Sequence, residues 1–327
     1  MSEKMHSVQS QETRSGVSIV VPVFNSEGSL RELVARLEQA LIPTTSEYEI
    51  VLVNDGSQDA SWNVLTDIAR TRPSVRGINL MRNFGQHNAL LAGVRAAAFD
   101  VVVTMDDDLQ NPPEEIPRLL AALQEGYDVV YGAAAQSHYD MWRALATYAT
   151  KLALKGTMGV GIARKVSPFR AFRTELRRAF SDHKGSFISI DVLLTWGAGR
   201  FTAVPVRHDP RRTGVSNYNF RRLATHAMNM ATGFSAVPLQ LASMAGLFFT
   251  LLGGGVFTFV LVRYLLEGTT VPGFPFLASI ISLFAGAQLF ALGIIGEYLS
   301  RMHFRLLEKP PYVVREQTSA ALASTVR

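Results

Sequence analysis

Three consecutive aspartates, Asp106 to Asp108, are the residues of this sequence whose types and spacing point most directly to chemistry. In an extended segment, residues two apart point the same way, so Asp106 and Asp108 can converge on one hard cation. Such a cation takes oxygen ligands and keeps phosphate as a co-ligand, and Gln110 can add a neutral oxygen. An acidic turn that caps the next helix is the alternative. The three aspartates directly follow an apolar run, and this position favours the metal site over a helix cap.

Three further clusters of polar residues each follow an apolar run in the same way. Open parallel sheets bind ligands just beyond the carboxyl ends of their strands, so these clusters predict one binding edge. The dinucleotide fingerprint G-x-G-x-x-G and the P-loop pattern are both absent. We therefore expect a nucleotide-binding type of sheet that holds phosphates by other means. The clusters are Asn25 with Glu27, Asn54 with Asp55, Gly56 and Ser57, and Arg82 with Asn83 and Gln86.

The elements that must position these clusters alternate between strand and helix. Short β-branched and apolar runs predict the strands, and apolar residues at helical spacing predict the helices between them. Such alternation is typical of an α/β fold with a doubly wound, mostly parallel, Rossmann-like sheet. The predicted strands are 17–24, 48–53, 75–81, 101–105 and 128–131, and the predicted helices are 30–41, 62–69, 86–98 and 113–124.

Two apolar runs without a charged residue, 237–262 and 268–296, follow this alternating part of the chain. Each exceeds the ~20 residues that an α-helix needs to cross a bilayer. Two buried core helices are the alternative, but soluble helices of this length rarely lack a charged face. Arginines precede the first run and follow the second, so we expect both ends of a transmembrane hairpin, 237–298, in the cytoplasm. Residues 299–327 then form a cytoplasmic tail.

The composition narrows the class of protein further. Of the 327 residues, 48% are hydrophobic and 18% are charged, and the net charge is +5. The absence of cysteine excludes a disulfide framework and a thiolate metal site. Residues 1–16 are polar and lack the apolar stretch of a signal peptide, so we expect a disordered tail there. The basic residues lie beside the apolar runs without an aromatic-basic motif, so nucleic acid is not an expected partner.

The segment 216–236 has apolar residues at roughly helical spacing, with Arg221, Arg222 and His226 between them. This pattern is typical of a juxtamembrane helix in the membrane interface, with its basic side toward lipid headgroups. An ordinary amphipathic helix packed on the catalytic part of the chain is the alternative.

The motifs together carry a family resemblance. Four segments, in this order, resemble the GT-A domain of inverting family-2 glycosyltransferases: VVPVFNSEG, VNDGSQD, RNFGQHNALLAG and DDDLQNPPEEIP. The last two, with RHDPRRTGVSNYNF and two transmembrane helices, are similar to polyprenyl-phosphate glycosyltransferases of the dolichol-phosphate-mannose-synthase type. The bacterial branch that glycosylates undecaprenyl phosphate, including aminoarabinose and glucosyl transferases, is the most similar. The resemblance covers about 17–312 and implies a GT-A domain over 17–215.

This resemblance implies roles for matching residues on the donor side. It implies that Asp55 hydrogen-bonds the nucleotide base, that Asp107 faces the ribose or the sugar, and that the cation is Mg²⁺ or Mn²⁺. A core position for Phe24 and an Asx-turn closed by Asp55 are the alternatives. The implied nucleotide pocket is lined by Pro22, Phe24, Asn25, Glu27, Gly56 and Ser57, and the implied metal ligands are Asp106, Asp108 and Gln110.

A basic middle segment is the candidate for phosphate binding, because arginine clamps phosphate with two parallel hydrogen bonds. Arg143, Arg170 and Arg211 are the candidates that hold the lipid phosphate or the donor diphosphate, and a solvated basic face is the alternative. Arg143 and Arg170, with Asp106 and Asp108, are the predicted catalytic residues, and Arg211 is a predicted donor-binding residue. Departures from the family pattern leave diphosphate binding and sugar choice open. These departures are Gly132-Ala133-Ala134-Ala135, Ser216-Asn217-Tyr218 and Ser167-Pro168.

These features predict an inverting, metal-dependent transferase at the bacterial inner membrane, with several membrane passes and a cytoplasmic catalytic domain. The expected reaction moves a sugar from a nucleotide-sugar, with UDP the expected nucleotide, to polyprenyl phosphate, and feeds cell-envelope glycan or lipid A modification. Membrane lipids are expected partners, and a homo-oligomer is left open. An ionised lipid phosphate can attack without a general base, so the enzyme needs only positioning and leaving-group stabilisation. The rival mechanism uses Asp191 as the base.

Two other functions compete with this prediction. A processive polysaccharide synthase of the same family carries a Q-x-x-R-W signature, which this sequence lacks. A non-catalytic membrane scaffold built on a degenerate transferase domain would not need the intact pair of Asp106 and Asp108.

Overall fold

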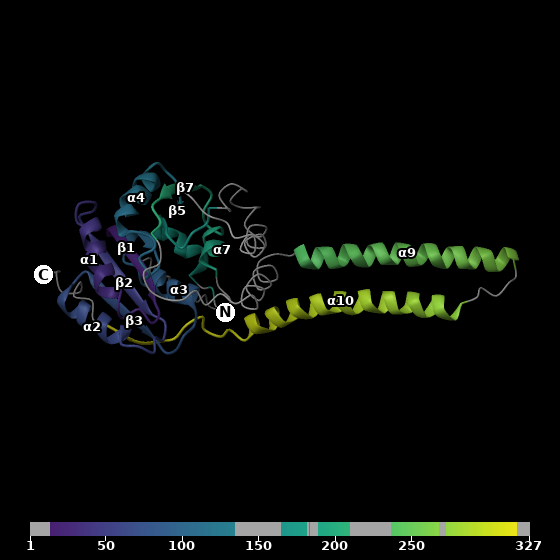
Figure 1. Cartoon of the computed structure of the whole chain (residues 1–327). Helices are drawn as coiled ribbons and strands as arrows, with labels where there is room; N and C mark the ends of the chain where they lie inside the picture. The colour runs from purple at the N-terminus through teal and green to yellow at the C-terminus, as the bar shows by residue number, and fades with distance from the viewer. Residues whose placement is uncertain are drawn as a thin grey trace, which may run out of the picture. The chain divides into compact units, whose positions relative to one another are not determined.

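The computed structural model describes residues 14–134, 165–181, 183, 189–209, 237–267 and 273–318. Contacts between residues divide the chain into two compact units (Figure 1). The first unit holds the β-sheet with its covering helices, and it includes the described residues from 310 onward. The second holds two long helices, α9 (Val237–Glu267) and α10 (Phe274–Leu306).

The first unit is built on one eight-stranded sheet with the order β7-β5-β6-β4-β1-β2-β3-β8. The central strands β4, β1, β2 and β3 are parallel, and β5 is parallel to β7. β6 is antiparallel to β4 and β5, and β8 is antiparallel to β3. The predicted mostly parallel α/β fold is confirmed. The strands are β1 (Arg14–Val23), β2 (Tyr48–Asn54), β3 (Val75–Leu80), β4 (Phe99–Thr104), β5 (Val129–Ala134), β6 (Arg170–Arg173), β7 (Phe201–Val206) and β8 (Val314–Gln317).

Helices cover both faces of this sheet. On one face, Val21 of β1 packs with Leu33 of α1 in the main hydrophobic core, which also takes in α2 and α4. On the other face, a Cβ added to Gly93 of α3 would lie 2.3 Å from Val20 Cγ1, so only glycine lets α3 approach this closely. The helices are α1 (Leu30–Leu41), α2 (Ser61–Thr71), α3 (Gln86–Ala96), η1 (Pro113–Glu115), α4 (Ile116–Gln124), η2 (Thr174–Phe180) and α7 (Ile190–Leu194).

The strands and helices predicted for the amino-terminal part are confirmed as β1 to β5 and α1 to α4, with small shifts at their ends. Two expected boundaries are wrong. β1 begins at Arg14, which pairs with Phe99 of β4, so residues 14–16 are not part of a disordered tail. Val314–Gln317 forms an edge strand of the sheet, so 299–327 is not simply a cytoplasmic tail. The juxtamembrane segment 216–236 lies outside the described residues.

The described residues of the two long apolar runs are helical over 237–262 and 274–296, as predicted, but the apolar stretches of the two helices differ in length. Among the described residues, only Ala242–Arg263 of α9 is long and apolar enough to span a bilayer, and none of its most apolar window is buried. The apolar stretch of α10, Phe284–Ser300, is shorter. Within their own unit the helices touch, because Phe249 and Phe284 meet edge to face at 6.0 Å. A membrane-spanning hairpin therefore remains a proposal.

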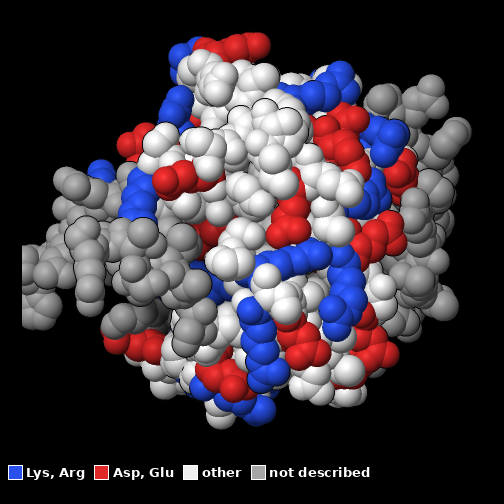
Figure 2. All heavy atoms as spheres, turned by 90° about the vertical axis from the view of Figure 1, so that its left-hand side faces the viewer, with Lys and Arg blue, Asp and Glu red and all other residues white. Residues whose placement is uncertain are grey.

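Charged side chains of both signs are interspersed over the face of the protein drawn in Figure 2. Ion pairs such as Arg36 with Glu114, at 2.8 Å, belong to this kind of mixed surface. Proteins that bind nucleic acid non-specifically use a field of Lys and Arg along the phosphate backbone. The described residues of this face therefore do not form such a field of one sign.

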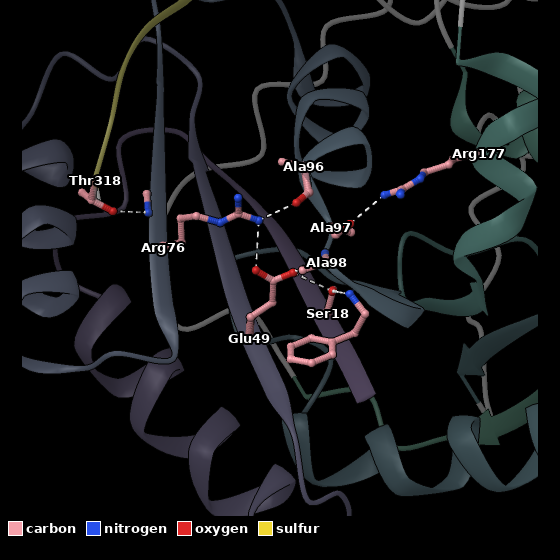
Figure 3. A network of polar contacts seen from close by, with 10 residues as sticks. Ser18, Glu49, Arg76, Ala96, Ala97, Ala98, Arg177 and Thr318 are labelled. Carbon is pink, nitrogen blue, oxygen red and sulfur yellow. Dashed lines mark hydrogen bonds and ion pairs between the residues drawn. The ribbon is translucent and has the colours of Figure 1, made fainter. Parts of the chain in front are cut away.

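A buried carboxylate joins several strands at the end of the sheet opposite to the polar clusters (Figure 3). Glu49 of β2 is 1% exposed and accepts hydrogen bonds from Ser18 Oγ at 2.7 Å and from Ala98 N at 2.6 Å. Its other oxygen lies 2.9 Å from the Arg76 guanidinium of β3, which also donates to Ala96 O at 2.5 Å. The network ties β1, β2, β3 and the loop before β4 together.

Replacing Glu49 by alanine is expected to lower the free energy of unfolding by about 3 kcal/mol, because Arg76 and the Ala98 N–H lose a buried acceptor. The denaturant dependence of tryptophan fluorescence in the full-length protein measures the change. Glu47→Ala is the matched control, since Glu47 is exposed and lies two residues earlier. Equal stability of the Glu49 and Glu47 variants would contradict the assigned role of this network.

Candidate active site

The three aspartates lie on a turn after β4, at the carboxyl end of the sheet, and all three are half-buried. Asp106 Oδ1 accepts a hydrogen bond of 2.6 Å from Gln86 Nε2 at the start of α3. Asp108 Oδ1 accepts from the backbone N–H of Gln110 at 3.2 Å. Leu109 between them has a φ of 60°, which is uncommon for a bulky residue. One strained turn therefore carries all three predicted metal ligands.

Asp107 accepts hydrogen bonds from the loop after β1, whereas Asp106 accepts one from the start of α3. Asp107 Oδ2 accepts hydrogen bonds from Ser26 Oγ at 2.5 Å and from Phe24 N at 3.3 Å. Burial raises the pKa of Asp107, and these two hydrogen bonds oppose the rise. Asp107 thus holds the loop after β1 against the loop after β4. Sequence reasoning missed Ser26, because a serine in a turn carries no signal of a distant partner.

Asn25 and Glu27 join the loop after β1 to the loop after β2. Asn25 has a φ of 54°, a conformation that asparagine tolerates, and its N–H donates to Ser57 Oγ at 3.0 Å. Asn25 Oδ1 accepts from Gln58 N at 2.8 Å, and Glu27 Oε2 accepts from Ala60 N at 2.8 Å. The structure therefore brings together three of the predicted pocket residues, Asn25, Glu27 and Ser57.

The two remaining pocket residues of β1 and its loop differ in exposure. Phe24 is 46% exposed, so its alternative interpretation as a core residue is wrong. Pro22 is buried inside β1 and pairs in register with Val53 of β2. Phe24 can therefore offer its ring to a ligand, whereas Pro22 shapes the end of the strand.

Asp55 and Gly56 hold the loop after β2 against the loop after β3. Asp55 is 3% exposed and accepts hydrogen bonds from Phe84 N at 2.7 Å and Gly85 N at 2.9 Å, rather than closing an Asx-turn. Burial raises the pKa of Asp55, and the two backbone hydrogen bonds oppose the rise. Gly56 has a φ of 67°, and an added Cβ would lie 2.4 Å from Asn83 N. A side chain at Gly56 would push the two loops apart.

The chain after β7 packs against the loop of the three aspartates, a contact that the sequence did not reveal. The Asp209 N–H donates to Gln110 O at 2.8 Å, and His208 Nδ1 lies 3.4 Å from Asn111 Oδ1. Arg207 forms an ion pair with Asp209 at 3.1 Å. The first three residues of the segment RHDPRRTGVSNYNF therefore lie beside the loop that follows the three aspartates.

Arg170 lies inside the first unit rather than at its surface. It is 1% exposed, it forms an ion pair with Asp191, and its Nε donates to Thr104 Oγ1 at 3.0 Å. The Tyr131 hydroxyl donates to the same Asp191 oxygen at 3.1 Å. This placement argues against the predicted phosphate-binding role of Arg170, because its guanidinium is buried and paired with Asp191. The same pairing argues against Asp191 as a general base.

The other two predicted phosphate-binding arginines, Arg143 and Arg211, lie outside the described residues. For the predicted metal, Asp106, Asp108 and Gln110 offer oxygen ligands, which suit Mg²⁺ or Mn²⁺. In the described part of the chain, no group of three or more His, Cys, Asp or Glu side chains could hold a metal ion. A cation at this pair of carboxylates would complete its coordination with phosphate or water oxygens.

Known proteins resemble this chain in sequence over nearly its full length. The profile of Glycosyl transferase family 2 matches residues 18–183. An undecaprenyl-phosphate 4-deoxy-4-formamido-L-arabinose transferase of Enterobacter sp. (strain 638) is 35% identical over 313 residues, which cover 94% of this chain and 95% of the relative. The transferase of the same description from Klebsiella pneumoniae is 36% identical, with 93% and 95% covered.

Solved structures resemble the chain more distantly. Glucosyl-3-phosphoglycerate synthase from Mycobacterium tuberculosis, in complex with Mn²⁺, UDP and phosphoglyceric acid, is 18% identical with a TM-score of 0.48, over 67% of this chain and 76% of that structure. S. aureus TarS 1-349 is 17% identical with a TM-score of 0.43, over 71% and 80%.

Proposed function

This chain belongs to glycosyltransferase family 2, and we propose that it transfers a sugar from a nucleotide-sugar, with UDP the expected nucleotide, to polyprenyl phosphate. The observation that carries the proposal is the identity of 35% with an undecaprenyl-phosphate sugar transferase over 94% of the chain. This match covers the long helices as well as the sheet. A processive synthase and a non-catalytic scaffold have no comparable support.

The donor would bind at the edge where the loops after β1, β2 and β4 meet. Phe24 is exposed there and can pack against the nucleotide, while Asn25, Glu27 and Ser57 hold the loops in place. We assign the nucleotide base to the side of Asp55, as the family resemblance implies, and Asp55 holds the loop after β3 there. Asp107 would support the binding of the ribose or the sugar by holding Ser26 and Phe24 through hydrogen bonds.

Asp106 and Asp108, with Gln110, would hold Mg²⁺ or Mn²⁺ together with the donor diphosphate. A bound divalent cation neutralises negative charge that develops on a diphosphate leaving group. Asp106 is held by Gln86, and the backbone of Gln110 is held by Asp209 and by Asp108. These contacts fix the turn, so the carboxylates need little rearrangement when the donor binds.

The acceptor phosphate is already ionised near neutral pH, so it can attack the anomeric carbon without a general base. The burial of Asp191 against Arg170 supports this base-free mechanism over the rival one. A single in-line displacement inverts the anomeric centre. The lipid phosphate oxygen forms the new glycosidic bond, and the nucleoside diphosphate leaves with the electrons of the old one.

We place the enzyme at the cytoplasmic face of a bacterial inner membrane, with α9 and α10 as a membrane-spanning hairpin. The apolar helix Ala242–Arg263 and the exposed Phe248, Leu251 and Leu265 support membrane insertion, because water does not solvate such a surface well. The glycosylated lipid would feed cell-envelope glycan or lipid A modification.

Mass spectrometry of the lipid product tests the proposed reaction. The full-length protein in detergent, given polyprenyl phosphate, Mg²⁺ and a panel of nucleotide-sugars, is expected to add one sugar to the lipid from one donor. Polyprenol without the phosphate is the matched control and should stay unmodified. Transfer to polyprenol, repeated sugar addition, or no product with any donor would each count against the proposal.

A further inference from the structure

We infer that the chain after α10 forms part of the donor site, and that Glu316 is a positioning residue for Asp55 and the loop after β3. The return segment, 312–318, follows α10 along the chain and contains β8, which pairs with β3 at the edge of the sheet. The inference rests on the proposed function only for the nature of the ligand. Its structural basis is a set of contacts within the first unit.

The return segment holds β3 from its third residue, Gly77, to Met81, the residue that follows the strand. At the third residue of the strand, the Gly77 N–H donates to Thr318 Oγ1 at 2.8 Å (Figure 3). The Thr318 N–H in turn donates to Gly77 O at 3.0 Å. At the other end, the Met81 N–H donates to Val313 O at 2.9 Å, and the Arg315 guanidinium donates to Met81 O at 3.1 Å. Met81 is the residue at which the loop after β3 begins.

A row of side chains runs from the return segment into the sheet. Asn79 Nδ2 donates to Glu316 Oε1 at 2.9 Å, and Asn54 Nδ2 donates to Asn79 Oδ1 at 2.8 Å. An ionised carboxylate only accepts hydrogen bonds, so Asn79 must turn its amino group to Glu316 and its oxygen to Asn54. Asn54 Oδ1 is buried without a partner among the described residues. The orientation of the row is therefore imposed from the Glu316 end.

The row of Glu316, Asn79 and Asn54 ends beside Asp55, and Asp55 holds the far end of the loop after β3. Asn54 directly precedes Asp55, whose two carboxylate oxygens accept from Phe84 N and Gly85 N. The loop 81–85 is thus held at Met81 by the return segment directly, and at Phe84 and Gly85 by Asp55. Loss of the Glu316 carboxylate leaves the buried Asn79 amide free to rotate, so Asn54 and the Asp55 loop lose a fixed neighbour.

Glu316→Ala in the full-length protein tests this inference with two measurements. Hydrogen exchange of the Phe84 and Gly85 amides is expected to become faster, because Asp55 holds them less firmly. The Kd for UDP, measured by calorimetry with Mg²⁺ present, is expected to rise roughly three- to tenfold. Glu316→Gln offers an acceptor oxygen but also a donor amide, so it is expected to cause a smaller change than Glu316→Ala. Gln317→Ala is the matched control, because its exposed side chain lies on the same strand.

Arg315→Ala is the second variant, since it frees Met81 O without touching the row of amides. It too is expected to speed exchange at Phe84 and Gly85. Unchanged exchange there in both alanine variants, or equal damage by Glu316→Gln and Glu316→Ala, would overturn the inference. If the unsubstituted protein binds no UDP, the expected donor is wrong, while the exchange measurement still decides whether Glu316 positions the loop.

Discussion

Asp108→Asn is expected to reduce sugar transfer at least about 100-fold while leaving the fold intact. The substitution removes a charged ligand of the proposed cation but changes the side-chain volume very little. Asp108 lies half-buried on the turn after β4, and its Oδ1 accepts a backbone hydrogen bond of 3.2 Å from Gln110 N, which an asparagine oxygen can also accept, so the turn should survive. Turnover of a nucleotide-sugar with polyprenyl phosphate, with and without EDTA, measures the effect.

The matched control for Asp108→Asn is Glu125→Gln, a neutralised acid on the exposed end of α4. This control should keep full activity. EDTA should stop the unsubstituted enzyme, and added Mg²⁺ or Mn²⁺ should restore it. Full activity of Asp108→Asn, or of the unsubstituted enzyme in EDTA, would remove the basis for a metal at this turn.

Arg170→Met is expected to lower the free energy of unfolding by about 3–5 kcal/mol, because it leaves Asp191 buried without its cation. Asp191→Leu should lower the free energy of unfolding by a similar amount, because it leaves the Arg170 guanidinium buried without its anion. The double variant should recover most of the loss, since a buried ion pair is often replaceable by apolar residues of similar volume. The Tyr131 hydroxyl belongs to the same buried site, since it donates to Asp191. Burial, the larger cause, and the negative charge of Asp191, the second, raise the pKa of Tyr131 far above its ordinary value.

Denaturant unfolding of the two single variants and the double variant measures the coupling between Arg170 and Asp191. Arg178→Met is the control, since Arg178 is an exposed arginine of η2. A phosphate-binding Arg170 predicts the reverse pattern, in which Arg170→Met keeps its stability and loses acceptor affinity. That result would contradict a structural role for the ion pair and would support a phosphate-binding role for Arg170.

Much of the first unit was predictable from the sequence, because its signals are local. Leu30, Leu33, Leu37 and Leu41 repeat at helical spacing, and the structure buries all four on α1. The polar residues after β1, β2 and β4 were expected at one edge, since parallel strands end on the same side. Contacts such as Asp107 with Ser26, at 2.5 Å, confirm that the loops meet there.

Residue types and their order along the chain were enough to predict the α/β sheet, the two long helices and the cluster at Asp106 and Asp108. Only the tertiary structure showed that Arg170 is buried and that Val314–Gln317 forms the edge strand beside β3. Arg170 has the type of a phosphate ligand, but its partner Thr104 lies 66 residues away, and no local pattern reports burial against a distant residue. Val314–Gln317 reads VREQ, too polar and short to predict a strand, and pairing with β3 makes it one. Edge strands gain their backbone hydrogen bonds from a neighbour, so their conformation depends on contacts such as that of Glu316 with Asn79, 237 residues apart.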